Sequence, residues 1–118
     1  MISKPDINLI SPETFAATGH PWEQYAWLRK NAPVYWHDEP NGPGFWAITK
    51  YEDVRTISRL PKVFSSYETS VMLPDPDPMG LYAQRLMMLN MDPPQHDRFK
   101  LFVSRGFTPK NAPLLRPK

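Results

Sequence analysis

His96 and Lys100 are the two residues whose types and spacing point most directly to chemistry. Side chains four residues apart on a helix lie side by side, so these two would form one cationic pair. An imidazole and an ammonium at the edge of a buried face require an anion, because an unpaired charge there is costly. We expect Asp97 to point elsewhere, so the sequence predicts that another segment or a ligand supplies the anion.

An alternative interpretation of the same residues needs no ligand. His96 would then be a histidine at the edge of the core whose hydrogen bonds are satisfied within the fold, and Lys100 would extend past the apolar surface to water. Arg98 and Arg105 are expected on the other flank of the helix.

The cationic pair depends on a helix over residues 92–106. Asp92 can accept hydrogen bonds from the free amides of a helix start, Pro93 suits the first helical position, and Gln95 fits a capping box. The helix is also expected to bury a stripe of residues at helical spacing, and Gly106 is a natural stop. This stripe consists of Phe99, Phe102, Val103 and Gly106.

The residues before this helix divide into a lead-in and a first helix. Residues 1–19 are expected to be an extended lead-in. A helix is predicted from His20-Pro21 to the residue before Pro33, because proline suits the first turn of a helix and ends one elsewhere. Helical spacing relates its apolar side chains, which are Trp22, Tyr25, Ala26 and Leu28.

Two aromatic and β-branched runs, residues 34–37 and 44–48, predict a hairpin joined by the turn-rich stretch DEPNGP. Two strands alone are marginally stable, so the hairpin is expected to begin a larger sheet. Thr49 and Glu52 have the spacing of a capping box and predict a second helix that ends by Pro61.

Residues 61–91 are punctuated by prolines and form a long loop in this interpretation. Within it, the stretch GLYAQRLMML has the pattern of a short amphipathic helix. A loop of this length in a compact domain is usually functional or mobile.

Composition excludes several classes of site. The 118 residues include 15 prolines, 4 tryptophans and 6 methionines, which describes an aromatic globular chain rather than a disordered one. The absence of cysteine rules out a disulfide, a thiolate metal site and a cysteine nucleophile within these residues. The three histidines lack zinc-ligand spacing, and there is neither a glycine-rich phosphate loop nor a serine in a nucleophile elbow.

The basic residues of the chain are concentrated near its C-terminal end, and no long apolar stretch is present. Residues 95–118 hold six lysines or arginines and one acid. Such a run can attract phosphates, an acidic protein surface or a carboxylated ligand. No recognised nucleic-acid motif accompanies it, so nucleic acid is not the expected partner. No stretch approaches the roughly 20 apolar residues of a membrane span, and no leader peptide is evident, so a cytoplasmic protein is expected.

The stretch from residue 92 to residue 110 closely resembles the C-helix signature of bacterial cytochrome P-450 monooxygenases: it reads DPPQHDRFKLFVSRGFTPK. Two upstream stretches agree with the same family, namely GFWAITKYEDV in the first hairpin strand and helix B, and PKVFSSYE after that helix. Within the family, GFWAITKYEDV, VFSSYET and MLNMDPP together look most like actinobacterial enzymes that hydroxylate the terminal methyl of steroid side chains and methyl-branched lipids.

The resemblance implies a mainly α fold with a small β-hairpin, of which residues 1–118 form the incomplete N-terminal portion. Residues 20–66 would hold helix A, the hairpin and helix B, residues 67–91 the B–C substrate loop, residues 92–106 helix C and residues 107–118 a tail. It also implies b-type haem held by a cysteine thiolate, molecular oxygen, and electrons from a ferredoxin-type partner.

By position in the motif, His96 and Lys100 match the residues that bind a haem propionate in such proteins. The family normally has arginine where Lys100 stands, so the contact here would be a point charge rather than a bidentate fork. Arg98 and Arg105 would face the side that receives the electron donor. A solvated basic face is an equal alternative for these two arginines.

The B–C loop forms the roof of the substrate pocket in this family. The residues expected to contact an apolar substrate are Val71, Met72, Leu86, Met88 and Leu89. Methionine adapts to irregular apolar shapes, but the same residues could simply fill gaps in a core.

The resemblance covers nearly all of this chain but only the first part of a complete enzyme. The expected function is therefore that of a truncated oxidoreductase, part of a haem-dependent monooxygenase for a hydrophobic substrate. Without a cysteine the 118 residues alone are expected to be inactive. The alternative is a fragment that binds lipid or haem without turnover.

Overall fold

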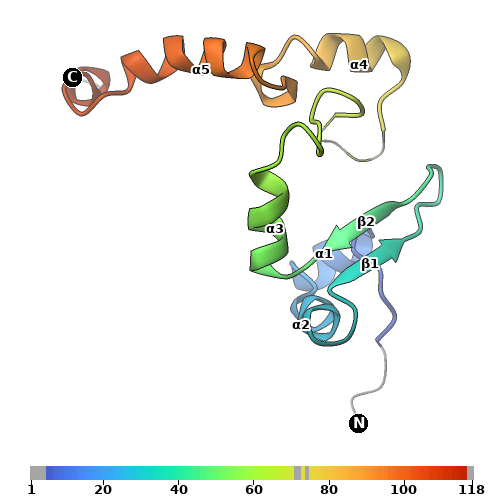
Figure 1. Ribbon diagram of the computed structural model, residues 1–118. Helices are drawn as coiled ribbons and strands as arrows, with labels where there is room; N and C mark the ends of the chain where they lie inside the picture. Colours follow the sequence, from blue (N-terminus) through green and yellow to red (C-terminus); the bar gives the residue numbers. More distant parts are fainter. Residues whose placement is uncertain (1–4, 71–72, 74, 117–118) are drawn as a thin grey trace. The chain divides into compact units, whose positions relative to one another are not determined.

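The computed structural model describes residues 5–70, 73 and 75–116 (Figure 1). The chain divides into two compact units, Met1–Arg59 and Leu60–Lys118. The described residues are rich in helix and contain one small antiparallel sheet of two strands. This confirms the expectation of a mainly α chain with a small β-hairpin.

The first unit begins with a helix that the sequence interpretation missed. Helix α1 spans Pro12–Thr18, so residues 1–19 are not simply an extended lead-in. Its start carries a standard signal, because the Ser11 hydroxyl accepts a hydrogen bond from the Thr14 amide at 3.3 Å and Pro12 occupies the first turn. Ser-Pro-Glu was readable in the sequence as a helix start.

Helix α2 spans Trp22–Asn31 and confirms the predicted first helix. Leu28, one of the residues predicted at helical spacing, is fully buried and lies in the core of this unit. Trp22 from the same set is 67% exposed, so the helix buries only part of its apolar surface.

Strands β1 (Val34–His37) and β2 (Phe45–Ile48) form the predicted hairpin. Tyr35 pairs with Ala47 and Trp36 with Trp46, in antiparallel register. Among the described residues the sheet contains only these two strands, so the larger sheet expected from the sequence is not found in this part of the chain.

Helix α3 spans Tyr51–Ser58, as predicted, but the predicted capping box is wrong. Lys50 is the N-cap residue and no side chain caps the helix. The Thr49 hydroxyl instead donates to the Pro33 carbonyl at 3.2 Å, and the Thr49 amide donates to the same oxygen at 3.1 Å. Thr49 therefore closes the open end of the hairpin rather than starting the helix.

The second unit contains helix α4 (Pro78–Gln84) and the short 3₁₀ turn η1 (Met88–Asn90) within the predicted long loop. Asp77 begins α4, since its carboxylate accepts a hydrogen bond from the Gly80 amide at 2.6 Å. The predicted amphipathic helix is thus confirmed in part, because it starts earlier and ends before the methionine-rich residues.

Helix α5 spans Gln95–Gly106, and a second 3₁₀ turn, η2, spans Ala112–Leu115. The predicted start of α5 is wrong in detail. Pro94 is the N-cap residue, the Pro93–Pro94 peptide bond is cis, and no side chain caps the helix. The Asp92 carboxylate, predicted to cap α5, is used elsewhere in the unit.

The apolar stripe of α5 is exposed in this structure, as expected for these 118 residues without the segments that the family would pack against it. Phe99 is 49% exposed and Phe102 is 73% exposed, and Val103 and Gly106 are exposed as well. Among the described elements, the three-residue turn η1 has the most extensive contact with α5, and it is too small to cover a helix of 12 residues. The spacing is that of a buried face, but the described residues provide nothing large enough to bury it.

Candidate functional site

His96 and Lys100 both lie on α5, one helical turn apart, so their side chains share a flank as the spacing predicted. The His96 side chain is 31% exposed, and Lys100 is exposed. Both groups are therefore at the surface of the described structure, where a ligand or another segment can reach them.

Asp97 does not point away from the pair, which corrects the sequence interpretation. Its Oδ1 lies 3.2 Å from Nδ1 of His96, and this contact, which is an ion pair only when the imidazole is protonated, is the one contact of that kind among residues 5–70, 73 and 75–116. The reason is local, since the two side chains are adjacent and both exposed enough to turn toward each other. Nε2 of His96 has no partner in the described structure, so the ring still has one nitrogen for a ligand.

Lys100 has no carboxylate within 4.0 Å in the described part of the chain. Arg98 and Arg105, on the same helix, are exposed and equally without an ion pair there. The helix therefore presents cations whose charges the fold does not neutralise. This pattern suits an external anion, and it equally suits a basic face in water.

A haem propionate is a carboxylate, and the donors of His96 and Lys100 match its chemistry. No group of three or more histidine or acidic side chains in the described residues could hold a metal ion. The sequence also contains no cysteine, so a thiolate ligand to haem iron must come from outside these 118 residues. The residues present could therefore bind a haem propionate, but they include no thiolate ligand for the haem iron.

Two of the five residues expected to contact substrate, Val71 and Met72, lie outside the described residues. The other three, Leu86, Met88 and Leu89, fall within one short stretch between α4 and α5. Leu86 and Leu89 are largely exposed, and Met88 is half-buried. The two leucines are therefore at the surface of the described residues.

Asp92 makes a contact that the sequence interpretation missed. Its Oδ2 accepts a short hydrogen bond from the Ser65 hydroxyl, and its Oδ1 accepts one from the Ser66 amide at 2.9 Å. The hydrogen bond from Ser65 is the main cause that lowers the pKa of Asp92; burial opposes it, and the amides of Ser66 and Tyr67 add to it. Nothing local in the sequence could have shown this pairing, because 27 residues separate Ser65 from Asp92.

Arg85 contacts the same segment from another direction. Its Nε donates to the Tyr67 carbonyl at 2.9 Å and its Nη2 donates to the Glu68 carbonyl at 3.2 Å. The guanidinium carbon also lies 4.2 Å from the centre of the Tyr67 ring, a cation–π contact. Arg85 was not singled out from the sequence.

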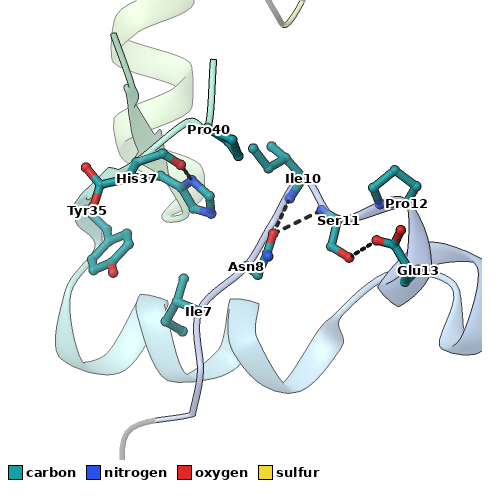
Figure 2. Close-up of a pocket in the computed structure, with 10 residues that line it drawn as sticks. Ile7, Asn8, Ile10, Ser11, Pro12, Glu13, Tyr35, His37 and Pro40 are labelled. Carbon is teal, nitrogen blue, oxygen red and sulfur yellow. Dashed lines mark hydrogen bonds between the residues drawn. The ribbon is translucent and has the colours of Figure 1, made fainter. Parts of the chain in front are cut away.

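The first unit contains a pocket of about 360 Å³ between the segment before α1 and the end of β1 (Figure 2). Its polar groups are largely bonded to one another. Asn8 Oδ1 accepts from the amides of Ile10 and Ser11, and the Ser11 hydroxyl donates to Glu13 at 2.7 Å. That last bond is the main cause that lowers the pKa of Glu13. The pocket therefore reads as part of the local packing rather than as a built ligand site.

No family model matches the chain. Individual relatives do match. A steroid C26-monooxygenase of Mycobacterium tuberculosis is 40% identical over 116 aligned residues, which cover 90% of this chain and 27% of that protein. A methyl-branched lipid omega-hydroxylase of the same species is 38% identical over 92 residues, covering 73% and 21%. A linalool 8-monooxygenase of Pseudomonas putida is 32% identical over 96 residues, covering 75% and 24%.

The chain is thus a relative of the bacterial cytochrome P-450 monooxygenases that its motifs resemble. The relatives it matches include a steroid C26-monooxygenase and a methyl-branched lipid omega-hydroxylase, the likeness that GFWAITKYEDV, VFSSYET and MLNMDPP together indicated. The chain spans about a quarter of the length of these curated relatives. In the described residues, no helix has the length and apolar character that a membrane crossing demands.

Proposed function

We propose that these residues form part of a haem-dependent monooxygenase that hydroxylates a hydrophobic substrate with molecular oxygen, a sterol side chain or a branched lipid. Residues 1–118 would then be one portion of a single cytochrome P-450 domain. The observation that carries this proposal is the 40% identity to a steroid C26-monooxygenase over 90% of the chain. Such identity spans both described units rather than one motif.

His96 and Lys100 would bind one haem propionate. Lys100 supplies a positive charge that no carboxylate neutralises within the described structure, and Nε2 of His96 is unoccupied there. Asp97, which accepts from Nδ1, would orient the imidazole, and Nε2 would donate to the propionate from the doubly protonated ring, because a neutral imidazole carries only one N–H. The haem, when bound through a thiolate from outside this chain, supplies the oxygen-activating chemistry.

Leu86, Met88 and Leu89, together with Val71 and Met72, would form the apolar contacts to the substrate. Two observations support the first three: they lie within one stretch, and that stretch leaves both leucines exposed. Exposed leucines within one short stretch offer a surface for a hydrocarbon, because covering them removes apolar area from water.

Arg98 and Arg105 would receive a ferredoxin-type electron donor. Both side chains are exposed on α5 and neither is paired with an acid in the part of the chain that the structure describes. Free surface cations raise the rate at which an acidic protein docks, and their effect falls with ionic strength.

A second candidate function is binding of lipid or haem without turnover. The absence of cysteine from the 118 residues favours it, because a haem bound by these residues alone could not acquire a thiolate ligand. Both functions use the same apolar and cationic side chains. They differ in whether a cysteine thiolate coordinates the haem iron.

A reduced carbon monoxide difference spectrum distinguishes the two. The 118-residue chain mixed with haem is expected to give no thiolate-type band, whereas a longer protein that includes these residues and a cysteine ligand is expected to give one. The longer protein should also hydroxylate a sterol or a branched fatty acid when supplied with electrons and oxygen. A longer protein that forms the band but oxidises neither substrate contradicts the proposed substrate class.

A further inference from the structure

We infer that Arg85 and Asp92 are positioning residues that fix both ends of the segment 86–91 to residues 65–68, through the Ser65 hydroxyl and the backbone of residues 66–68. This inference rests on the proposed function, in which Leu86, Met88 and Leu89 of that segment contact the substrate. Neither residue would touch the substrate. Each would act by holding the segment in one place.

The Asp92 end of the segment is held by a carboxylate that receives two hydrogen bonds. The Ser65 hydroxyl donates to Oδ2 and the Ser66 amide donates to Oδ1 at 2.9 Å. The same Ser65 oxygen accepts from the amides of Tyr67 and Glu68, at 3.1 and 3.3 Å. Ser65 therefore links the carboxylate to the next turn of backbone, and hydrogen bonds to an ionised acceptor are the stronger kind.

The Arg85 end is held by a guanidinium that donates to two carbonyls of the same backbone. The bonds from Nε and Nη2 reach Tyr67 and Glu68, and the guanidinium lies over the Tyr67 ring. A planar group with fixed donors restricts the geometry more than a single bond would. Residues 65–68 are thus held through their donors by an anion and through their carbonyls by a cation.

Between these two ends the segment is anchored on its inner side. Asn90 is 2% exposed, and its Nδ2 donates to the Gln84 carbonyl at 3.0 Å. Met91 is buried as well. Asn90 and Met91 therefore lie on the buried side of the segment, and Leu86 and Leu89 lie on its exposed side.

Asp92 also connects the segment to the helix that carries the cationic pair. Its carbonyl accepts a hydrogen bond from the His96 amide at 3.1 Å, at the start of α5. One residue therefore joins the base of the candidate substrate segment to the first turn of the candidate propionate helix. A displacement of Ser65 can therefore be transmitted to His96 through the side chain and the backbone of Asp92 alone.

Because Asp92 is ionisable, its contacts should depend on pH, which the contacts of a residue that only fills space would not. Hydrogen bonds lower the pKa of Asp92, with Ser65 as the main cause. The neighbouring segments also carry Glu68, Arg85, His96 and Asp97, and none of these charges is among the causes of the shift. A lowered pKa means that the contacts are complete above the ordinary aspartate pKa and weaken as pH falls through the lowered value.

Hydrogen–deuterium exchange on a longer protein that contains these 118 residues, the same one used for the carbon monoxide spectrum, tests the inference at single amides. At neutral pH we expect protection of the Ser66 amide and of the amides of Leu86, Met87, Asn90 and Met91. Asp92→Asn and Arg85→Gln should each raise the exchange of these amides about tenfold. In the wild type the protection of Ser66 should fall on acidification below the ordinary aspartate range, and in Asp92→Asn it should no longer depend on pH there.

Two matched variants serve as controls, Asp75→Asn and Arg116→Gln, because both residues are exposed and neither side chain forms a hydrogen bond or an ion pair within the described residues. They should leave the exchange of the segment unchanged. Equal Ser66 exchange in the wild type and in Asp92→Asn at neutral pH overturns the inference, as does a pH profile that Asp92→Asn does not alter.

A separate measurement distinguishes this inference from the proposed function. Energy transfer from tryptophan to the fluorescent sterol dehydroergosterol reports sterol binding by a protein that contains these residues. If the exchange results hold and no sterol binds, the proposed substrate class fails while the positioning role of Arg85 and Asp92 stands. If the sterol binds and the exchange results fail, the positioning role of Arg85 and Asp92 fails while the proposed substrate class stands.

Discussion

The backbone amide of Leu9 donates a hydrogen bond to Nε2 of His37 at 3.0 Å, across 28 residues of chain. The other ring nitrogen, Nδ1, donates to the Asp38 carbonyl at 2.6 Å, so the imidazole is neutral with its proton on Nδ1. The ring also stacks on Phe45, with centroids 4.9 Å apart. His37 therefore joins the segment before α1 to the hairpin, and Figure 2 shows its ring between them.

Replacing His37 with phenylalanine keeps an aromatic ring and removes both hydrogen bonds. The Leu9 amide would lose its acceptor, which costs about 1–3 kcal/mol when a donor is left unsatisfied. We expect Leu9 to exchange its amide hydrogen at least tenfold faster, measured by hydrogen–deuterium exchange. His20→Phe, which changes an exposed histidine, should leave the Leu9 amide unchanged. An unaltered Leu9 amide in His37→Phe would contradict the contact.

Gly44 provides a test of the hairpin turn. Its φ is +87°, and a Cβ there would lie 2.8 Å from both the His37 carbonyl oxygen and a ring carbon of Trp36. Gly44→Ala should therefore strain the backbone and displace the Trp36 ring, at a cost of about 1–3 kcal/mol. The readout is the near-ultraviolet circular dichroism of the Trp36–Trp46 pair, whose rings are 5.1 Å apart. Gly106→Ala, where a Cβ meets nothing within 4 Å, should leave that signal intact.

Residues close together in sequence account for what could be predicted. The spacing of Trp22 to Leu28 gave helix α2, the aromatic runs gave the hairpin, and the stretch after Pro94 gave α5. The capping predictions at Thr49 and Asp92 failed because each side chain bonds to a residue far away in sequence, at Pro33 and at Ser65. A local pattern cannot reveal a competing partner of this kind.

The burial of side chains was the other property that could not be predicted from their helical spacing. The stripe on α5 has the period of a core-facing helix, and Phe102 is nevertheless 73% exposed. Period shows which side chains share a face, whereas burial depends on whether another element covers that face. The candidate site shows the same limit, since the shared flank of His96 and Lys100 was predictable and the contact of Asp97 with His96 was not.

The exposed apolar side chains predict how the isolated chain behaves. Trp22, Trp46 and Phe102 are each at least 60% exposed, together with many smaller apolar groups. We expect the 118-residue chain to oligomerise or aggregate and to bind a hydrophobic dye, because exposed apolar surface favours association. Phe102→Glu should reduce both, as seen by light scattering and dye fluorescence. A sharp, cooperative thermal transition of a monomer that binds no dye would contradict this expectation.

Lys100→Arg tests whether the residue at this position binds a carboxylate. Arginine can bind a carboxylate with two parallel hydrogen bonds, whereas lysine provides a point charge. If Lys100 contacts a propionate, the substitution should tighten haem binding by about threefold to tenfold. Arg98→Lys, a change of the same kind at an exposed cation of α5, should not alter the affinity. Equal haem affinity in Lys100→Arg and the wild type would count against the contact.

Haem titration of the double variant His96→Ala/Lys100→Ala, followed by absorbance, tests the central claim most directly. Arg98→Ala/Arg105→Ala is the matched control, since it removes two exposed cations from the same helix. We predict that the first variant binds haem at least tenfold more weakly than the wild type, through loss of charge-assisted hydrogen bonds, and that the control is unchanged. Haem affinity that is the same in the His96→Ala/Lys100→Ala variant and the wild type would contradict the account.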